Sequence, residues 1–153
     1  MMGKLSGKTA LITGASKGIG EGIARVYARE GANLVLCARG SQTEQLCEAL
    51  REEYGIEAIF VQTDVSDMQA CVHAAAEAAA HFGQIDVLVS NAGVCRLGGF
   101  LEAREEDRDY PRGVNVKGAW NICHAVLPYM KERQYGRVII MSSVTGYMVA
   151  DPG

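Results

Sequence analysis

Hydrophobic residues in this chain gather in five short runs that are separated by longer amphipathic stretches. The runs, each bounded by turn-forming residues, cover residues 8–12, 33–38, 56–62, 85–89 and 137–141. Short continuous apolar runs predict strands that are buried on both faces. Because apolar residues recur at helical spacing between the runs, the pattern predicts an α/β fold: a Rossmann-type doubly wound parallel sheet with helices on both faces, truncated after its fifth strand.

Polar residues mark where several of these helices begin. Ser41 and Ser66 each stand three positions before a Glu or Gln, which predicts a capping box at the start of two helices. Pro128 falls within the last predicted helix and is expected to kink it, because proline removes a backbone hydrogen bond. The apolar residues at helical spacing along that helix are Val116, Trp120, Cys123, Leu127 and Met130.

A glycine-rich bend joins the first predicted strand directly to the first predicted helix. Gly14 permits a tight turn, Gly18 lets the backbone approach a phosphate, and Gly20 brings the helix close to the strand. Backbone N–H groups and the positive end of a helix converge there, which suits a pyrophosphate; the alternative is an ordinary structural turn. The predicted dinucleotide-binding residues of this bend are Gly14, Ala15, Ser16, Lys17, Gly18, Ile19 and Gly20.

The end of the second predicted strand indicates which dinucleotide is bound. An NAD site usually has a carboxylate here to hold the ribose hydroxyls, whereas this chain has Ala38, Arg39 and Gly40. Lys17 adds a second cation on the same edge of the sheet. Two cations without a carboxylate favour the 2′-phosphate of NADP as cofactor over NAD. The alternative is a pair of solvated surface cations.

Two further segments follow predicted strands at the same edge. Asp64 is suited to accept a hydrogen bond from an adenine amino group while Val65 packs on the ring. The alternative for Asp64 is a role in starting the next helix, although Ser66 is already placed to do so. Small residues at 90–93 let a cofactor lie against the backbone, which is a weak signal in isolation. The predicted binding residues of these segments are Asp64, Val65, Asn91, Ala92 and Gly93.

Five motifs therefore occur along the chain in a definite order. They are Thr13-Gly14-x-x-x-Gly18-Ile19-Gly20, Asp64-Val65, Asn91-Ala92-Gly93, Asn115-Val116-Lys117-Gly118 and Ser142-Ser143. In order and spacing they resemble the short-chain dehydrogenase/reductase family, over the whole chain. The resemblance implies an oxidoreductase that transfers hydride between a nicotinamide cofactor and a carbonyl or alcohol substrate, and a homo-oligomer when complete. With the cations Lys17 and Arg39, we expect an NADP-dependent enzyme that uses NADP(H). The resemblance also implies that Asn115 anchors a proton-relay water and that Ser143 binds the substrate oxygen.

The chain departs from this family's pattern near the asparagine motif. Ser90 replaces an asparagine, which is a mild change. Pro111 and Gly113 fall where the family has continuous helix, and such an interruption would displace Asn115.

A third departure concerns the proton donor. The family's Tyr-x-x-x-Lys, expected about a dozen residues after Ser143, would lie beyond Gly153. Tyr147 cannot replace that tyrosine, because Asp151 stands where the lysine belongs. We therefore expect residues 1–153 to be a single dinucleotide-binding domain, incomplete at its C-terminus and inactive alone. A non-catalytic dinucleotide-binding module is the alternative; a nucleotide-binding methyltransferase fits Arg39 and residues 91–93 less well.

Composition removes several other classes of function. The net charge of −3 offers no basic surplus for nucleic acid. No apolar run approaches the ~20 residues of a membrane span, and the first residues lack the layout of a signal peptide. Five cysteines without a C-x-x-C pair and three histidines without ligand spacing predict no metal site and a reducing, cytoplasmic location.

Overall fold

Five parallel strands form the sheet of the computed structural model, which describes residues 3–96, 98–99 and 101–143. Their spatial order is β3-β2-β1-β4-β5, so β1 lies at the centre and the chain crosses over it between β3 and β4. Every pairing is parallel, as the alternation of strands and helices predicts. The strands are β1 (Thr9–Thr13), β2 (Asn33–Ala38), β3 (Ala58–Gln62), β4 (Val87–Ser90) and β5 (Arg137–Ile140).

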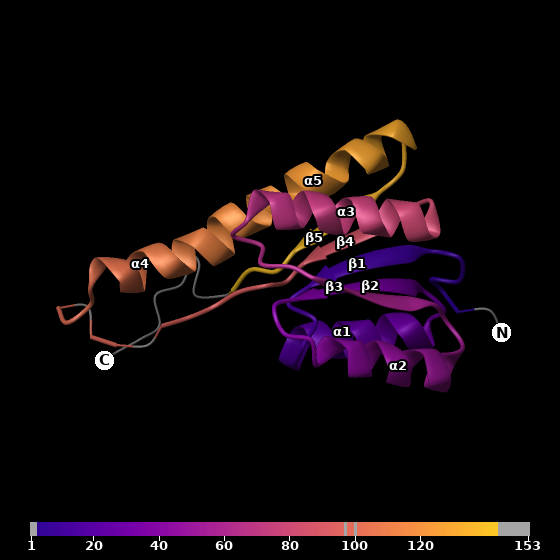
Figure 1. Ribbon diagram of the computed structural model, residues 1–153, viewed down its shortest axis with the longest axis horizontal. Coiled ribbons are helices and arrows are strands. Elements are labelled where there is room, and N and C mark those ends of the chain that lie inside the picture. Colours follow the sequence, from indigo (N-terminus) through magenta and orange to yellow (C-terminus); the bar gives the residue numbers. More distant parts are fainter. Residues whose placement is uncertain (1–2, 97, 100, 144–153) are drawn as a thin grey trace.

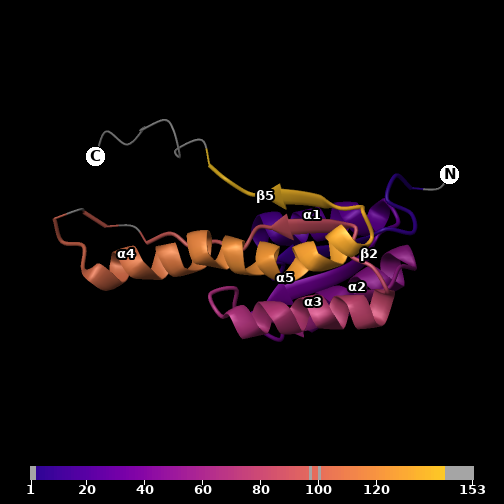
Figure 2. The same ribbon diagram turned by 90° about the horizontal axis from the view of Figure 1, so that it is seen from above.

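Helices cover both faces of the sheet, which confirms the predicted doubly wound architecture (Figure 1). The helices α1 (Gly18–Arg29) and α2 (Thr43–Tyr54) lie on one face, and α3 (Met68–Phe82) and α5 (Gly118–Glu132) lie side by side on the other. Figure 2 shows that α4 (Glu105–Pro111) extends beyond the sheet in line with α5. A π-helical turn, η1 (Arg112–Lys117), joins α4 to α5.

The central strand β1 supplies both layers of the core. All five of its residues are buried, and Leu11 and Ile12 point to opposite faces because side chains alternate along a strand. Leu11 packs in the layer that includes Ile122 of α5, whereas Ile12 packs in the layer that includes Leu50 of α2. The edge strand β5 is different, since all four of its residues are exposed.

The two predicted capping boxes are wrong. The N-cap of α3 is Asp67, whose carboxylate accepts a hydrogen bond of 2.8 Å from the Gln69 amide. The Ser66 hydroxyl instead donates to Asp64 and therefore takes no part in capping α3. At α2 the N-cap is Gln42, and the Glu44 amide donates to the backbone carbonyl of Ser41 rather than to its hydroxyl.

The buried face of α5 also differs from the apolar spacing in the sequence. Trp120 and Leu127 are exposed, as is Val116 in η1, whereas the polar Asn121 is almost fully buried. The Asn121 side chain donates a 2.8 Å hydrogen bond to the Val65 carbonyl, and this bond compensates the cost of burying an amide. Pro128 lies inside α5, which continues to Glu132. In the described residues, no helix is long and apolar enough to cross a membrane.

Candidate functional site

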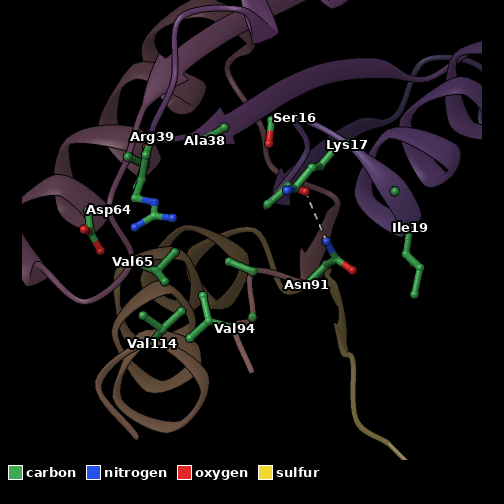
Figure 3. Close-up of a pocket in the computed structure, with 15 residues that line it drawn as sticks. Ser16, Lys17, Ile19, Ala38, Arg39, Asp64, Val65, Asn91, Val94 and Val114 are labelled. Atoms are coloured by element: carbon green, nitrogen blue, oxygen red, sulfur yellow. Dashed lines mark hydrogen bonds between the residues drawn. The ribbon is translucent and has the colours of Figure 1, made fainter. Parts of the chain in front are cut away.

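The carboxyl ends of β1, β2, β3 and β4 surround a cavity of about 380 Å³. Ligands of parallel α/β sheets bind at this edge, where the chain reverses its direction of travel across the sheet. Figure 3 shows residues that line the cavity, contributed by the glycine-rich bend, the loops after β2, β3 and β4, and η1. The full lining is Gly14, Ser16, Lys17, Gly18, Ile19, Ala38, Arg39, Thr63, Asp64, Val65, Asn91, Ala92, Gly93, Val94 and Val114.

Most of the residues that the sequence predicts for cofactor binding therefore meet around one cavity. Ala15 and Gly20 do not line it, because both are buried behind the glycine-rich bend. The structure adds Val94 and Val114 as apolar walls, which the motifs did not indicate. That a dinucleotide binds to this set of residues stays a prediction.

Each of three positions in the bend requires glycine for a different structural reason. Gly14 has a φ of +66°, and a Cβ there would lie 2.8 Å from the Cα of Ala92, so the loop after β4 can pack directly against the bend. A Cβ on Gly20 would overlap the carbonyl oxygen of Gly14. Gly18 has a φ of +58° and faces open space, and together with the N-terminus of α1 it forms part of the cavity wall. The backbone there is open to an anion.

Asn91 braces the bend from the loop after β4. Its side-chain amide donates to the carbonyl oxygens of Thr13 (3.1 Å) and Gly14 (3.3 Å), and Figure 3 shows the bond to Gly14. The backbone amides of Asn91 and Ala92 both donate to the Thr13 hydroxyl at 3.0 Å. Thr13 is thus the residue that joins the two loops, although the sequence presents it only as the first letter of a glycine motif.

Arg39 and Asp64 lie on the wall of the cavity away from Asn91 (Figure 3). The Asp64 carboxylate accepts bonds from the Ser66 hydroxyl (2.7 Å) and the Ser66 amide (2.9 Å). The Ser66 hydroxyl holds the pKa of Asp64 below its usual range, with smaller contributions from the Ser66 amide and the charge of Arg39. The alternative considered from the sequence, that Asp64 orders the start of the next helix, therefore has a structural basis.

Asn115 lies in the π-helical turn, and Pro111 and Gly113 do not break the helical path around it. The Gly118 amide donates to the Gly113 carbonyl in the wider π-helical pattern, so the helical path runs from Glu105 to Glu132. Asn115 makes two 2.8 Å hydrogen bonds to the backbone of Val94, one to the amide and one to the carbonyl. The structure therefore places Asn115 against the loop after β4.

Ser143 lies three residues after the end of β5 and is exposed. Its segment stays beside β4, because the Met141 amide donates a 3.0 Å hydrogen bond to the Ser90 carbonyl. Ser143 is not part of the cavity lining given above. Tyr147 and Asp151 lie outside the described residues.

The central parallel sheet, the glycine-rich bend at its first crossover and the cavity beyond the strand ends define a Rossmann-type dinucleotide-binding fold. The sequence pattern of the family described as short chain dehydrogenase matches residues 8–151, and the chain belongs to that family. Residues 91–98, 142–146 and 148–153 predict a particular likeness to the bacterial oxidoreductase UcpA, and this prediction is confirmed. The chain is 57% identical over 152 residues to the oxidoreductase UcpA of Salmonella typhimurium, covering 99% of this chain and 57% of the relative.

Two solved dehydrogenase structures share the fold of this chain. An alcohol dehydrogenase from the archaeon Thermococcus sibiricus, complexed with 5-hydroxy-NADP, matches with a TM-score of 0.86 and 34% identity over 93% of this chain and 61% of that chain. A short-chain type dehydrogenase/reductase from Mycobacterium marinum matches with a TM-score of 0.91 and 30% identity over 97% of this chain and 60% of that chain. The chain thus spans somewhat more than half the length of these relatives.

Proposed function

We propose that this chain is the cofactor-binding part of an NADP-dependent oxidoreductase that interconverts a carbonyl and an alcohol. The observation that carries the proposal is the pair of cations, Lys17 and Arg39, on the wall of a cavity that also contains the glycine-rich bend. Residue 38 is alanine, so the carboxylate typical of NAD sites does not stand there. The Thermococcus sibiricus relative, complexed with an NADP derivative, adds support.

The cavity residues fit the parts of NADP in order. The open backbone at Gly18 and the N-terminus of α1 would hold the pyrophosphate, and Arg39 with Lys17 would hold the 2′-phosphate. Val65 and Val114 form an apolar wall suited to the adenine ring, and the second carboxylate oxygen of Asp64 is an acceptor for the adenine amino group. When bound, the cofactor would supply or accept the hydride.

Asn115 and Ser143 would act on the substrate side. Asn115 is fixed through Val94, so its place relative to the loop after β4 is rigid; we assign it to the proton-relay water. Ser143, beyond the end of β5, is assigned to the substrate oxygen. The proton itself needs a group that titrates usefully, and neither side chain provides one. We propose that a Tyr-x-x-x-Lys in the remaining length of the whole protein provides it, and that these 153 residues alone are inactive.

The proposal also includes self-association of the protein and its location in the cell. Exposed Trp120 and Leu127 on α5 and the exposed residues of β5 favour a homo-oligomer. Burial raises the pKa of the Cys37 thiol to about 12, which describes an unreactive core residue. We assign the protein to a reducing, cytoplasmic location because its five cysteines are all free.

Binding of NADPH and NADH by isothermal titration calorimetry tests the cofactor assignment. Because one charge-assisted hydrogen bond contributes about 1.5–3 kcal/mol, we expect NADPH to bind at least about tenfold more tightly than NADH. Arg39→Asp should reverse much of this preference, since it repels the 2′-phosphate and offers an acceptor to the ribose hydroxyls. Arg29→Asp, the same change at the far end of α1, should leave the preference intact. Equal affinities in the parent chain would refute NADP preference.

Turnover separates the enzyme from a non-catalytic binding module. We expect no hydride transfer by the 153-residue chain, and turnover in the whole protein that falls by about 10²–10⁴-fold when its proton donor is removed. A whole protein that binds NADPH yet reduces no carbonyl compound would favour the binding module.

A further inference from the structure

The guanidinium of Arg39 is held by a residue from a distant part of the chain. Arg39 Nη1 donates a 3.0 Å hydrogen bond to the hydroxyl of Tyr110, the residue before the last residue of α4, 71 positions away in the sequence. We propose that Tyr110 is a positioning residue that fixes Arg39 for a phosphate on the ribose 2′ position, and so helps to determine the choice between NADP and NAD. This inference rests on the proposed function.

The hydrogen-bond partner of Arg39 is a neutral phenol, so it does not neutralise the charge of the guanidinium. Other arginines of the described residues, such as Arg25, Arg96 and Arg133, pair with carboxylates that neutralise them. A phenol hydroxyl fixes one N–H of Arg39 and leaves its charge available to an incoming anion, and the guanidinium has further donors to offer.

The neighbouring carboxylate of Asp64 does not form an ion pair with Arg39 that would take the place of the 2′-phosphate. Its Oδ1 atom is engaged by the hydroxyl and amide of Ser66, and no ion pair joins it to Arg39, both residues being in the described part of the chain. Figure 3 shows the Arg39 side chain extending from the end of β2 along the cavity, with its guanidinium between Asp64 and the interior of the cavity.

Both ends of Arg39 are fixed before any ligand arrives. The Gln62 side chain donates a 2.9 Å hydrogen bond to the Arg39 carbonyl, which holds the backbone, while Tyr110 holds the guanidinium. A free arginine loses much rotamer freedom when it binds a phosphate, and an arginine that is already ordered loses less. Tyr110 therefore favours the ligand that uses Arg39 and is neutral toward the ligand that does not.

Tyr110 is itself held in place. The guanidinium of Arg96 lies over its ring, 5.1 Å from the centroid, and Arg96 pairs with Asp107 of α4 at 2.6 Å. The ring also packs against the core layer that contains Val114, four residues further along the helical path, and Val114 lines the cavity. The segment from α4 to η1 thus supplies both a wall of the cavity and the anchor for Arg39.

Tyr110→Phe tests the inference, because it removes the hydroxyl and keeps the ring under Arg96. Dissociation constants would be measured by calorimetry for NADPH and NADH, and for the fragments 2′,5′-ADP and 5′-AMP, which differ only in the 2′-phosphate. We expect about three- to tenfold weaker binding of NADPH and 2′,5′-ADP, the loss of one hydrogen bond, with NADH and 5′-AMP unchanged. Tyr135→Phe, at the other end of the sheet, should alter none of the four.

A double-mutant cycle gives the second readout. In an Arg39→Ala background, Tyr110→Phe should have no further effect on NADPH, because the tyrosine acts through the arginine. Equal weakening of NADPH and NADH by Tyr110→Phe, or no change in either, would overturn the inference while leaving the proposed function in place. Tighter NADPH binding by the variant would also overturn it, since Tyr110 would then restrain Arg39 away from the ligand. A parent chain that binds no dinucleotide would refute the proposed function itself, and this inference with it.

Discussion

The two ends of the parallel sheet contrast in how their charged groups are paired. At the amino end, Asp86 precedes β4 and is completely buried, and its carboxylate is fully engaged. It accepts 2.8 Å hydrogen bonds from the Thr9 amide and the Gln84 side chain. Arg133 and Lys8 approach the same carboxylate at 3.3 and 3.9 Å. One buried anion thereby ties β1, β4 and the end of α5 together.

At the carboxyl end the charged groups are cations on the wall of a cavity. Arg39 contacts a neutral phenol, and neither Arg39 nor Lys17 takes part in an ion pair among the described residues. Removing a buried charge whose partners are all within the protein destabilises the fold, because those partners are left uncompensated, whereas a charge held without a counter-ion is available to a ligand. Substitution of the buried Asp86 should therefore lower stability and spare cofactor affinity, whereas substitution of Arg39 or Lys17 should lower cofactor affinity and spare stability.

The largest effect on stability is expected from Asp86→Ala. It leaves a buried Thr9 amide without its acceptor and two cations without their carboxylate, at a cost of about 3 kcal/mol in the free energy of unfolding. Denaturant unfolding followed by circular dichroism measures this loss, and NADPH affinity of the folded fraction should not change. Glu57→Ala removes an exposed carboxylate paired with His81 and should cost at most about 0.5 kcal/mol. Similar losses for the two variants would show that burial of the Asp86 carboxylate does not determine its contribution to stability.

Two glycines of α1 allow a comparison within a single helix, because Gly20 lies against the glycine-rich bend and Gly22 does not. A Cβ on Gly20 would overlap the Gly14 carbonyl, so Gly20→Ala must shift the glycine-rich bend and should cost about 1–3 kcal/mol and weaken NADPH binding. Gly22 has nothing within 4 Å of such a Cβ, and Gly22→Ala should stabilise the chain by about 0.5–1 kcal/mol. Thermal melts and calorimetry with NADPH measure both effects. If Gly20→Ala left the affinity unchanged, the bend would be structural only.

The features that the sequence predicted well are local ones. Buried strands read as apolar runs, and the glycine-rich bend lies between a strand and a helix that adjoin it directly, so parallel pairing brings the loops after β1, β2, β3 and β4 to one edge. Arg39 could be placed at that edge because it immediately follows β2.

The features that the sequence did not predict depend on contacts between distant segments. The buried face of α5 includes Asn121 because the Val65 carbonyl accepts its amide, and apolar spacing carries no sign of that bond. Ser66 resembled an N-cap, but Asp64 competes for its hydroxyl. The contact between Arg39 and Tyr110 spans 71 positions. A signal was available only in the i, i+4 spacing of Tyr110 and Val114, which puts them on one side of a helical segment.

The smallest expected effect concerns Asp64 and its pH dependence. The pKa of Asp64 is lowered in the folded chain, chiefly by the Ser66 hydroxyl, so its contribution to stability is present above the ordinary aspartate pKa of about 4 and is lost as the pH falls through the folded value. Ser66→Ala should raise this pKa toward its ordinary value. Because Asp64 is exposed, the loss of stability at pH 7 should stay well below 1 kcal/mol.

Unfolding free energies of Ser66→Ala and the parent at pH 7 and near pH 3 check this, with Ser41→Ala as the control. The penalty of Ser66→Ala should be smaller at the lower pH, because protonation of the Asp64 carboxylate weakens its acceptance of the hydroxyl bond and removes the charge that the bond stabilises. Ser41 uses its carbonyl at the start of α2, so its penalty should not vary with pH. An equal penalty for Ser66→Ala at both pH values would mean that the hydroxyl stabilises the start of α3 without the charge of Asp64.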